Sequence, residues 1–231
     1  DTMTPVQEAV LEIEQPNADL LVSAQTGSGK TLAFGLSIAA TLLKKNAEFG
    51  RPNLPFALII APTRELALQV RKELEWVYAR TKAQFASCVG GMDPRAERRI
   101  LESGAHIVVG TPGRLRDHIE RGALSLSDIK AVVLDEADEM LDMGFREDLT
   151  FILEKAPVNR RTLLFSATVP IQIAKMARTY QKEAIRISVS SKKTQHLDIN
   201  YHAIKIQPSD RDKAIINLLL YHDVSGAIVF R

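Results

Sequence analysis

Short apolar runs alternate with longer amphipathic segments along most of the chain. The longer segments place apolar residues three or four positions apart, as in Leu66, Val70 and Leu74, which is the spacing of one helix face. The short runs predict strands at 19–23, 56–61, 85–89, 106–110, 131–135, 162–166 and 185–189. Strands that alternate with helices are typical of a parallel sheet covered by helices. The pattern therefore predicts an α/β fold with a mainly parallel sheet.

The composition changes near residue 190. Ser and Lys dominate residues 188–194, which indicates a linker. Beyond it, Ser209 and Asp212 resemble a capping box at the start of a helix. The elements expected in this part are a strand at 200–206, a helix that ends at Leu220 and a strand at 227–230.

A strand, a helix and a strand are too few elements to bury a hydrophobic core. We therefore expect this part of the chain to be the beginning of a second domain, and the chain to be a fragment. The expected division is a first domain at residues 1–189, a linker at 190–199 and the incomplete start of a second domain at 200–231.

The composition is that of a soluble globular protein. Of 231 residues, 45% are hydrophobic and 25% are charged, and no apolar run approaches the roughly 18 residues of a membrane helix. Residues 1–5 lack a charged and then apolar leader, and Cys88 is the single cysteine, so we expect a reducing, cytoplasmic location and no membrane contact. A net charge of +2 is nearly neutral, so nucleic-acid binding has to be argued from local sites.

Residues 24–31 have the sequence of a phosphate-binding loop. An apolar run precedes them and a helix-favouring run follows, which is the context the motif requires, although Ala24 stands where the common pattern has glycine. Glycines let backbone N–H groups approach phosphate oxygens, while Lys30 adds positive charge and Thr31 a hydroxyl for magnesium. The residues expected to bind a nucleoside triphosphate here are Ala24, Gln25, Thr26, Gly27, Ser28, Gly29, Lys30 and Thr31.

An acidic pair follows a later apolar run. Asp135 and Glu136 come directly after residues 131–134, so they are expected at the carboxyl end of a central strand, where α/β sheets bind ligands. Asp135 is suited to hold Mg²⁺ through its water shell, and Glu136 to orient and partly deprotonate the water that attacks the γ phosphate. Alone, the pair would fit a solvated turn; the phosphate loop favours the catalytic interpretation.

These two motifs belong to a longer ordered series. The segments, in chain order, are 4–7 (Thr-Pro-Val-Gln), 24–31, 62–67 (Pro-Thr-Arg-Glu-Leu-Ala), 90–91 (Gly-Gly), 111–114 (Thr-Pro-Gly-Arg), 135–138 (Asp-Glu-Ala-Asp) and 166–168 (Ser-Ala-Thr). The series resembles that of the DEAD-box RNA helicases, specifically the first of that family's two RecA-like domains. It is most similar to the bacterial cold-shock members. The resemblance covers residues 1 to about 190, and residues 227–230 are similar to the start of the second domain.

The resemblance implies an ATP site with Mg²⁺ in a RecA-like domain. Gln7 matches the residue that reads adenine, and a glutamine amide offers the donor and acceptor which the adenine edge requires. Thr31 and Asp135 are the implied magnesium-binding residues. The residues implied in catalysis, or in coupling it to strand separation, are Lys30, Asp135, Glu136, Ser166 and Thr168.

The resemblance also implies an RNA surface. The matching positions are Pro62, Thr63, Arg64, Gly90, Gly91, Thr111, Pro112, Gly113 and Arg114. Glycines and small hydroxyl residues expose backbone N–H groups and hydroxyls to phosphate and ribose oxygens, and the arginines add charge. Because none of these side chains is suited to distinguish bases, sequence-independent contacts with the RNA backbone are expected.

The implied activity is ATP-dependent unwinding or remodelling of RNA, with ATP and RNA bound between the two RecA-like domains. The arginine fingers of the family lie in the second domain, so the isolated chain is expected to be a weak ATPase. Two alternatives stay open at this point: an RNA clamp that uses ATP as a latch and does not need Glu136, and a DNA helicase or another P-loop motor. The sequence leaves open the RNA substrate, the pathway and the oligomeric state.

The densest basic cluster lies outside this series. Arg95, Arg98 and Arg99 fall on a helix expected to begin near Pro94, with Glu97 among them. Mixed charge of this kind is typical of a solvated helix face, so we expect the cluster to lie outside the RNA site. The five histidines show no metal-ligand spacing, and magnesium is the only metal implied.

Overall fold

The computed structural model describes residues 2–43, 48–189, 202–222 and 226–229. Contacts divide the chain into two units, Asp1–Ser191 and Lys192–Arg231. The linker expected at 190–199 lies outside the described residues, so the domain boundaries stay predictions. In the described part of the chain, no helix is both long and apolar enough to cross a bilayer.

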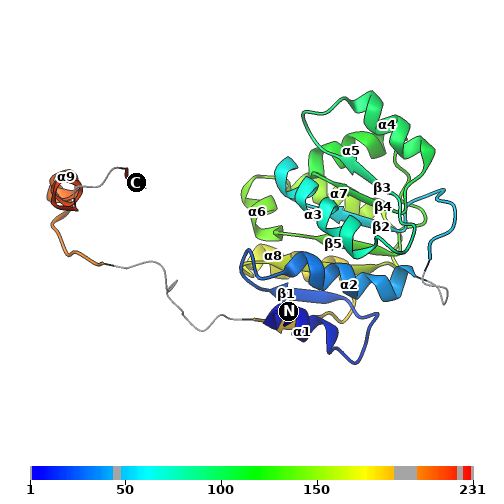
Figure 1. The fold of residues 1–231 in the computed structure, drawn as a ribbon, viewed down its shortest axis with the longest axis horizontal. Helices are drawn as coiled ribbons and strands as arrows, with labels where there is room; N and C mark the ends of the chain where they lie inside the picture. The colour runs from blue at the N-terminus through cyan, green and yellow to red at the C-terminus, as the bar shows by residue number, and fades with distance from the viewer. Residues whose placement is uncertain (1, 44–47, 190–201, 223–225, 230–231) are drawn as a thin grey trace. The chain divides into compact units, whose positions relative to one another are not determined.

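The first unit is built on a seven-stranded sheet in the order β3-β4-β2-β5-β6-β1-β7, and every strand pair is parallel (Figure 1). The strands are β1 (Leu20–Ser23), β2 (Ala57–Ile60), β3 (Phe85–Cys88), β4 (Ile107–Gly110), β5 (Ala131–Leu134), β6 (Arg161–Ser166) and β7 (Ile185–Ser188). Every strand predicted between residues 19 and 189 is present, with ends that differ by at most one residue. The predicted α/β class with a parallel sheet is therefore confirmed.

Helices cover both faces of this sheet. They are α1 (Pro5–Leu11), α2 (Lys30–Leu42), α3 (Arg64–Val77), α4 (Pro94–Ser103), α5 (Pro112–Glu120), α6 (Ala137–Asp142), α7 (Arg146–Lys155) and α8 (Ile171–Tyr180). Buried residues of α1, α2 and α3 join one hydrophobic cluster, and those of α5, α6, α7 and α8 join another. The sheet thus separates two hydrophobic cores.

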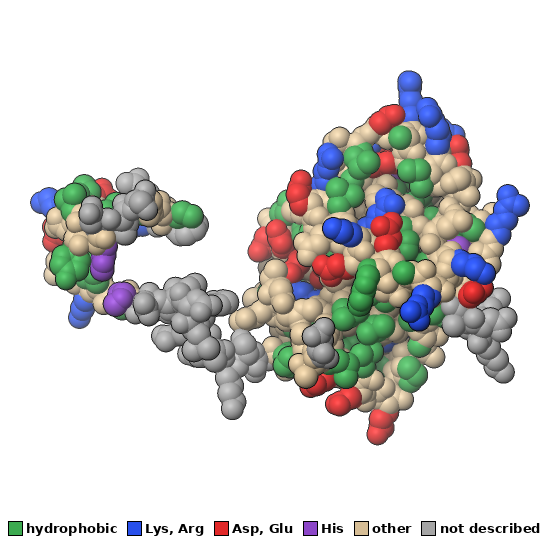
Figure 2. Space-filling view, viewed as in Figure 1, with side chains coloured by type: hydrophobic (Ala, Val, Ile, Leu, Met, Phe, Trp, Pro, Cys, Tyr) green, Lys and Arg blue, Asp and Glu red, His purple; other side chains and the backbone are tan. Residues whose placement is uncertain are grey.

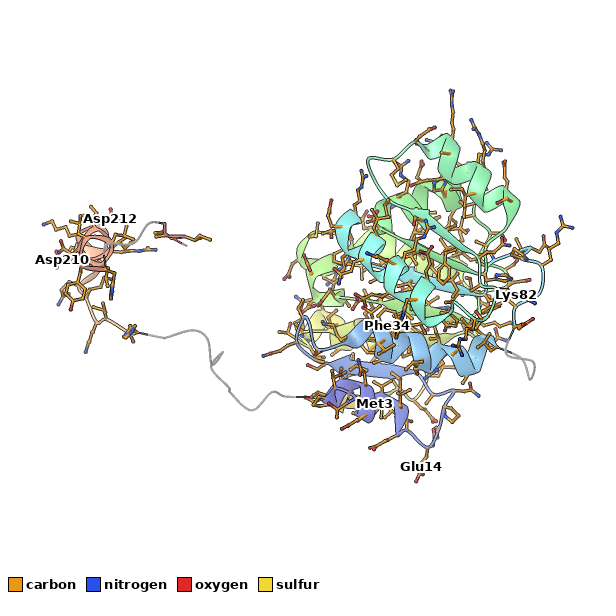
Figure 3. The ribbon with its side chains drawn as sticks, viewed as in Figure 1. Met3, Glu14, Phe34, Lys82, Asp210 and Asp212 are labelled. Atoms are coloured by element: carbon orange, nitrogen blue, oxygen red, sulfur yellow. The ribbon has the colours of Figure 1, made fainter. Side chains whose placement is uncertain are left out.

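Alternation along the strands explains the two cores. Ile59 of β2 belongs to the first cluster, whereas its neighbours Leu58 and Ile60 belong to the second, because successive side chains of a strand point to opposite faces. Phe34, labelled on α2 in Figure 3, packs against Phe165 of β6 with ring centroids 5.4 Å apart in an edge-to-face arrangement. The central strands β2, β4 and β5 are buried at all four positions, which is why continuous apolar runs predicted them.

Two helices at the carboxyl edge of the sheet begin at capping residues. Thr63 caps α3, and its Oγ1 accepts a hydrogen bond from the backbone N–H of Leu66 at 3.2 Å. Asp93 caps α4 by accepting from the backbone N–H of Arg95 at 2.9 Å. Such caps satisfy backbone donors that have no partner within the helix, so the helix starts next to these motifs are fixed by the sequence.

The second unit contains one α-helix in its described part. A short 3₁₀ helix, η1 (Pro208–Asp210), leads into α9 (Arg211–His222), so the expected helix is present and extends two residues beyond Leu220. The strands expected at 200–206 and 227–230 are absent from the described parts of those ranges. A strand requires hydrogen bonds to a neighbouring strand, and the described residues of this unit include none. No residue of α9 is buried.

Candidate nucleotide site and RNA surface

The strands of a parallel sheet all end at one edge, and this edge carries the motif residues. The phosphate loop follows β1, Asp135 and Glu136 follow β5, and Ser166 ends β6. The segments with RNA-binding expectations follow β2, β3 and β4, at 62–64, 90–91 and 111–114. Because the strand order is β3-β4-β2-β5-β6-β1-β7, the nucleotide set follows the adjacent strands β5, β6 and β1, and the RNA set follows the adjacent strands β3, β4 and β2. The two sets are therefore neighbours across the β2–β5 pair.

Two glycines shape the loop between β1 and α2. Gly27 and Gly29 have φ angles of +77° and +88°, a left-handed conformation that glycine adopts at little cost. Ala24 is not among the described residues with positive φ, so alanine is tolerated where the common pattern has glycine. Its backbone N–H donates to the carbonyl of Ser166 at 3.0 Å, which ties the start of the loop to β6.

Lys30 links the loop to the acidic strand end. Its Nζ donates to the carbonyl of Ala24 at 3.1 Å and to Oε1 of Glu136 at 2.9 Å, and the side chain is 5% exposed. Thr26 donates its hydroxyl to the same Oε1 at 3.0 Å. The carboxylate of Glu136 thus occupies the place where the loop lysine and a loop hydroxyl converge. A phosphate oxygen is an equally good acceptor for both donors.

Glu136 also has an unusual backbone. Its φ and ψ are 50° and 53°, in the left-handed region that costs a non-glycine residue about 1–2 kcal/mol. The residue sits at the N-terminus of α6 and is buried. Backbone strain of this kind is concentrated at functional sites, where surrounding contacts enforce it. Here the sharp turn after β5 brings the carboxylate to Lys30.

Asp135 is the other carboxylate of the pair. The pKa of Asp135 is raised to about 7, because burial and then the neighbouring Glu136 charge raise it more than Lys30 lowers it. Oδ1 of Asp135 accepts from the backbone N–H of Glu136 at 3.1 Å. A carboxylate that is buried in this way gains charged character when a cation binds beside it. The oxygen-rich donor set of Asp135 and Thr31 is of the type that Mg²⁺ prefers.

Gln7 lies against the phosphate loop. Its Nε2 donates to the carbonyl of Gly29 at 3.3 Å, and its Oε1 accepts from the backbone N–H of Thr4 at 3.0 Å. A Cβ on Gly29 would come within 2.5 Å of that Nε2. Gln7 therefore anchors α1 to the loop, and a side chain at position 29 would displace the Gln7 amide. Its role in adenine recognition stays a prediction.

Ser166 and Thr168 contact a different acid from the catalytic pair. Thr168 donates to Oδ2 of Asp138 from its backbone N–H at 2.9 Å and from its hydroxyl at 2.8 Å, while Ser166 Oγ accepts from the backbone N–H of Asp138 at 3.2 Å. Partial burial opposes ionisation, but the hydrogen bonds from Thr168 and Ser166 lower the pKa of Asp138 overall. Our sequence interpretation omitted Asp138 from the site, although it ends the Asp-Glu-Ala-Asp segment.

The segments expected to bind RNA contact one another. Arg64 Nη1 lies 3.5 Å from the carbonyl of Gly90, and Arg114 Nη2 donates to the carbonyl of Met92 at 3.2 Å. Gly91 has a φ of +76°, and a Cβ there would come within 2.7 Å of Arg64 Nη1. The ends of β2, β3 and β4 therefore form one connected surface.

Exposure divides the predicted RNA-binding residues into three groups. Arg64, Gly90, Gly91 and Gly113 are exposed, and Thr63, Thr111 and Arg114 are half-buried. The side chains of Pro62 and Pro112 are buried, and Pro112 begins α5, where proline fixes the first helical turn. The two prolines therefore shape the surface but offer little area for contact with RNA.

Comparisons with known proteins agree with this geometry. The family model described as "DEAD/DEAH box helicase" matches residues 4–176. "DEAD-box ATP-dependent RNA helicase CshA" of Geobacillus kaustophilus is 40% identical over 98% of this chain and 47% of its own length. "DEAD-box ATP-dependent RNA helicase 53" of Oryza sativa subsp. japonica is 45% identical over 98% of this chain and 38% of its own length. The chain thus spans less than half of these relatives.

A solved structure shares the fold. The crystal structure of a DEAD box protein from the hyperthermophile Methanococcus jannaschii superposes with a TM-score of 0.72 at 34% identity, and covers 94% of this chain and 56% of its own. The family model, the curated relatives and this structure all point to one group of proteins, in agreement with the series of motifs at the carboxyl edge of the sheet. The chain therefore belongs to the DEAD/DEAH box helicase family.

Proposed function

We propose that this chain is the nucleotide-binding part of a cytoplasmic ATP-dependent RNA helicase that separates or remodels short RNA duplexes. The observation that supports this most strongly is the 2.9 Å contact between Lys30 and Glu136. It joins the phosphate loop to the acidic strand end. The candidate RNA surface lies on the adjacent strands of the same sheet edge.

Nucleotide binding begins with an exchange of partners at Lys30. The γ phosphate replaces the Glu136 carboxylate as the acceptor for Lys30 Nζ, and the glycine-shaped loop supplies backbone N–H groups at the N-terminus of α2. Thr31 and Asp135 are the residues that would hold Mg²⁺, which neutralises phosphate charge when it is bound.

The same exchange prepares Glu136 for hydrolysis. Once Lys30 is bound to phosphate, the Glu136 carboxylate is free to accept a proton from the attacking water. Its backbone conformation holds it in place, so little reorganisation is needed. Asp138, which is bonded to Ser166 and Thr168, then connects the strand that carries the catalytic pair to the segment after β6.

RNA binds through backbone and small side-chain contacts at 62–64, 90–91 and 111–114. This surface offers arginine charge, backbone N–H groups and threonine hydroxyls, which recognise phosphate and ribose without selecting bases. A second RecA-like domain of the same protein closes over ATP and RNA, supplies arginine fingers and favours a bent strand. Because both ligands favour the closed state, each strengthens binding of the other.

ATP turnover by the full-length protein with and without RNA tests this proposal. We expect single-stranded RNA to increase turnover strongly, and a DNA oligonucleotide of the same sequence to leave it near the basal rate. The isolated 231-residue chain should remain slow in both cases, since an arginine finger contributes about a thousandfold. Equal stimulation by DNA would favour another P-loop motor. RNA binding without any stimulated turnover would favour an ATP-latched clamp.

A further inference from the structure

Glu97 is buried inside an otherwise exposed basic helix. Arg95, Arg98 and Arg99 of α4 are exposed, as expected from the sequence, and Figure 2 shows Lys and Arg side chains gathered over this part of the molecule. Glu97 is only 2% exposed. The expectation that this residue belongs to the solvated face is therefore wrong. It points inward because α4 packs on β3, next to the turn that carries Gly90.

Both oxygens of the Glu97 carboxylate are bonded. Oε1 accepts from the backbone N–H of Val89 at 2.9 Å, and Oε2 accepts from Nε2 of His118 at 2.7 Å. The guanidinium Nε of Arg114 lies 3.6 Å from Oε2. Because a carboxylate only accepts, Nε2 of His118 carries the proton in this contact. His118 is itself 2% exposed, so the pair is almost free of solvent.

These contacts join the pieces of the candidate RNA surface. Val89 directly precedes the Gly90-Gly91 turn, and Arg114 and His118 lie one turn apart on α5. Arg114 in turn donates to the carbonyl of Met92, just beyond the glycine pair. The Glu97 carboxylate thus contacts both Val89, at the start of the glycine turn, and Arg114, which bonds to Met92 at the end of the turn.

A metal site is the rival interpretation of this cluster. Cys88, Glu97 and His118 each offer one ligand atom, and these atoms lie within 4.8 Å of one another. Burial raises the pKa of the Cys88 thiol, and the nearby Glu97 raises it further, whereas a metal ligand must be a thiolate. The Arg114 guanidinium already provides positive charge beside the carboxylate. The chemistry therefore fits a hydrogen-bonded network better than a cation site.

We propose that Glu97 is a positioning residue for RNA binding. It does not touch RNA; it holds the Gly90-Gly91 turn through Val89 and orients the Arg114 guanidinium. The inference rests on the proposed RNA-binding function of those segments. A buried carboxylate with charged and backbone donors is a strong and directional constraint, so its loss loosens two RNA-contacting groups together.

The substitution Glu97→Gln tests this with little change in shape. The amide oxygen still accepts from Val89, but the negative charge opposite Arg114 is lost. We expect the Kd of the full-length protein for a fluorescein-labelled oligouridine, measured with a non-hydrolysable ATP analogue, to rise about tenfold. In RNA-stimulated turnover, the KM for RNA should rise in parallel, while the KM for ATP and the kcat at saturating RNA stay near the parent values.

Glu102→Gln is the matched control, because Glu102 lies on the same helix and is exposed in an ion pair with Arg98. It should leave RNA affinity unchanged. Arg114→Ala should cost less RNA affinity in the Glu97→Gln background than in the parent protein, because both changes act on one network. This non-additivity separates positioning from a general loss of stability, which would weaken ATP and RNA binding alike.

Three results would overturn the inference. One is an unchanged KM for RNA in the Glu97→Gln protein, in an assay in which RNA stimulates turnover by the parent protein. Another is a loss in which the KM values for ATP and RNA rise by the same factor. A parent protein that neither binds oligouridine nor responds to it would remove the proposed function itself, together with the inference that depends on it.

Discussion

At the scale of single residues, the contact between Lys30 and Glu136 is the main link between the phosphate loop and the acidic strand end. One carboxylate oxygen accepts from both Lys30 and Thr26, and a phosphate oxygen could accept from the same two donors. In the proposed function, the acid therefore competes with the nucleotide before binding and acts on the attacking water afterwards. This double use follows from the chain reversal at Glu136, whose left-handed backbone aims the side chain back at the loop.

Glu136→Gln separates the two uses. The neutral amide competes less well for Lys30, so we expect the affinity for an ATP analogue to stay equal or increase. The amide cannot accept a proton, so kcat should fall by a factor of about 100 to 10,000. Calorimetry and single-turnover hydrolysis measure the two effects. The control is Glu139→Gln, at an exposed position on α6, which should hydrolyse ATP at the parent rate. Turnover at the parent rate in Glu136→Gln would show that Glu136 is not the general base.

We expect His106 to make the stability of the first unit depend on pH. Its Nδ1 accepts from the backbone N–H of Gln84, and its Nε2 donates to the carbonyl of Gly50, both at 3.0 Å. Burial lowers the pKa of His106, and the hydrogen bond to Gly50 opposes this. The unfolded chain therefore takes up a proton more readily than the folded one. Stability is complete above the ordinary histidine pKa of about 6.5 and decreases as the pH falls below it.

Urea unfolding between pH 7.5 and 5 tests this sign. His106→Gln should lower stability at neutral pH, because the paired contacts are lost, and should flatten the decrease towards pH 5. His202→Gln, at an exposed histidine, should leave the slope unchanged. A steeper decrease in His106→Gln than in the parent protein would show that the histidine is protonated in the folded state.

At the scale of elements, the phosphate loop depends on two glycines for different reasons. Gly27 and Gly29 both have positive φ, so any side chain adds backbone strain of about 1 kcal/mol. Around Gly27 a Cβ would meet nothing within 4 Å, whereas at Gly29 it would lie 2.5 Å from Gln7 Nε2. The second position therefore adds a collision with α1 to the strain.

The two alanine substitutions should differ accordingly. Gly29→Ala is expected to displace Gln7 and to lower the affinity for an ATP analogue clearly more than Gly27→Ala does. Thermal unfolding should record a larger decrease in Tm for Gly29→Ala, because the contact between α1 and the loop is broken as well. If the two variants behave alike, the packing of Gln7 against the loop has no energetic role.

The elements themselves were largely predictable, and the site only in part. Every strand of the sheet was located within one residue. The central strands β2, β4 and β5 are buried on both faces and read as apolar runs, and the edge strand β7 alternates between apolar and polar residues. The burial of Glu97 was not predictable from a helix with mixed charges, since it depends on donors at Val89 and His118 that lie elsewhere in the sequence. The strand expected at 200–206 failed for the opposite reason: local alternation is present, but the described residues offer no partner strand.

At the scale of the whole molecule, the strand order places the proposed nucleotide site next to the proposed RNA surface. Strands β1, β5 and β6 carry the nucleotide set, strands β2, β3 and β4 carry the RNA set, and β2 pairs directly with β5. The backbone N–H of Asp135 donates to the carbonyl of Ile60 at 2.9 Å across that pair. This hydrogen bond joins the acidic strand end directly to the end of β2, two residues before Pro62.

In the proposed function, Lys30, Asp135 and Glu136 form a single binding site for a magnesium-bound triphosphate. The most direct test is calorimetric titration of the full-length protein and of its Lys30→Ala variant with a non-hydrolysable ATP analogue in the presence of Mg²⁺. We expect one site per chain in the parent protein, with binding lost or reduced at least about a hundredfold in Lys30→Ala, since a buried charged contact to phosphate is removed. Absence of binding to the parent protein, or unchanged affinity in Lys30→Ala, would contradict the account.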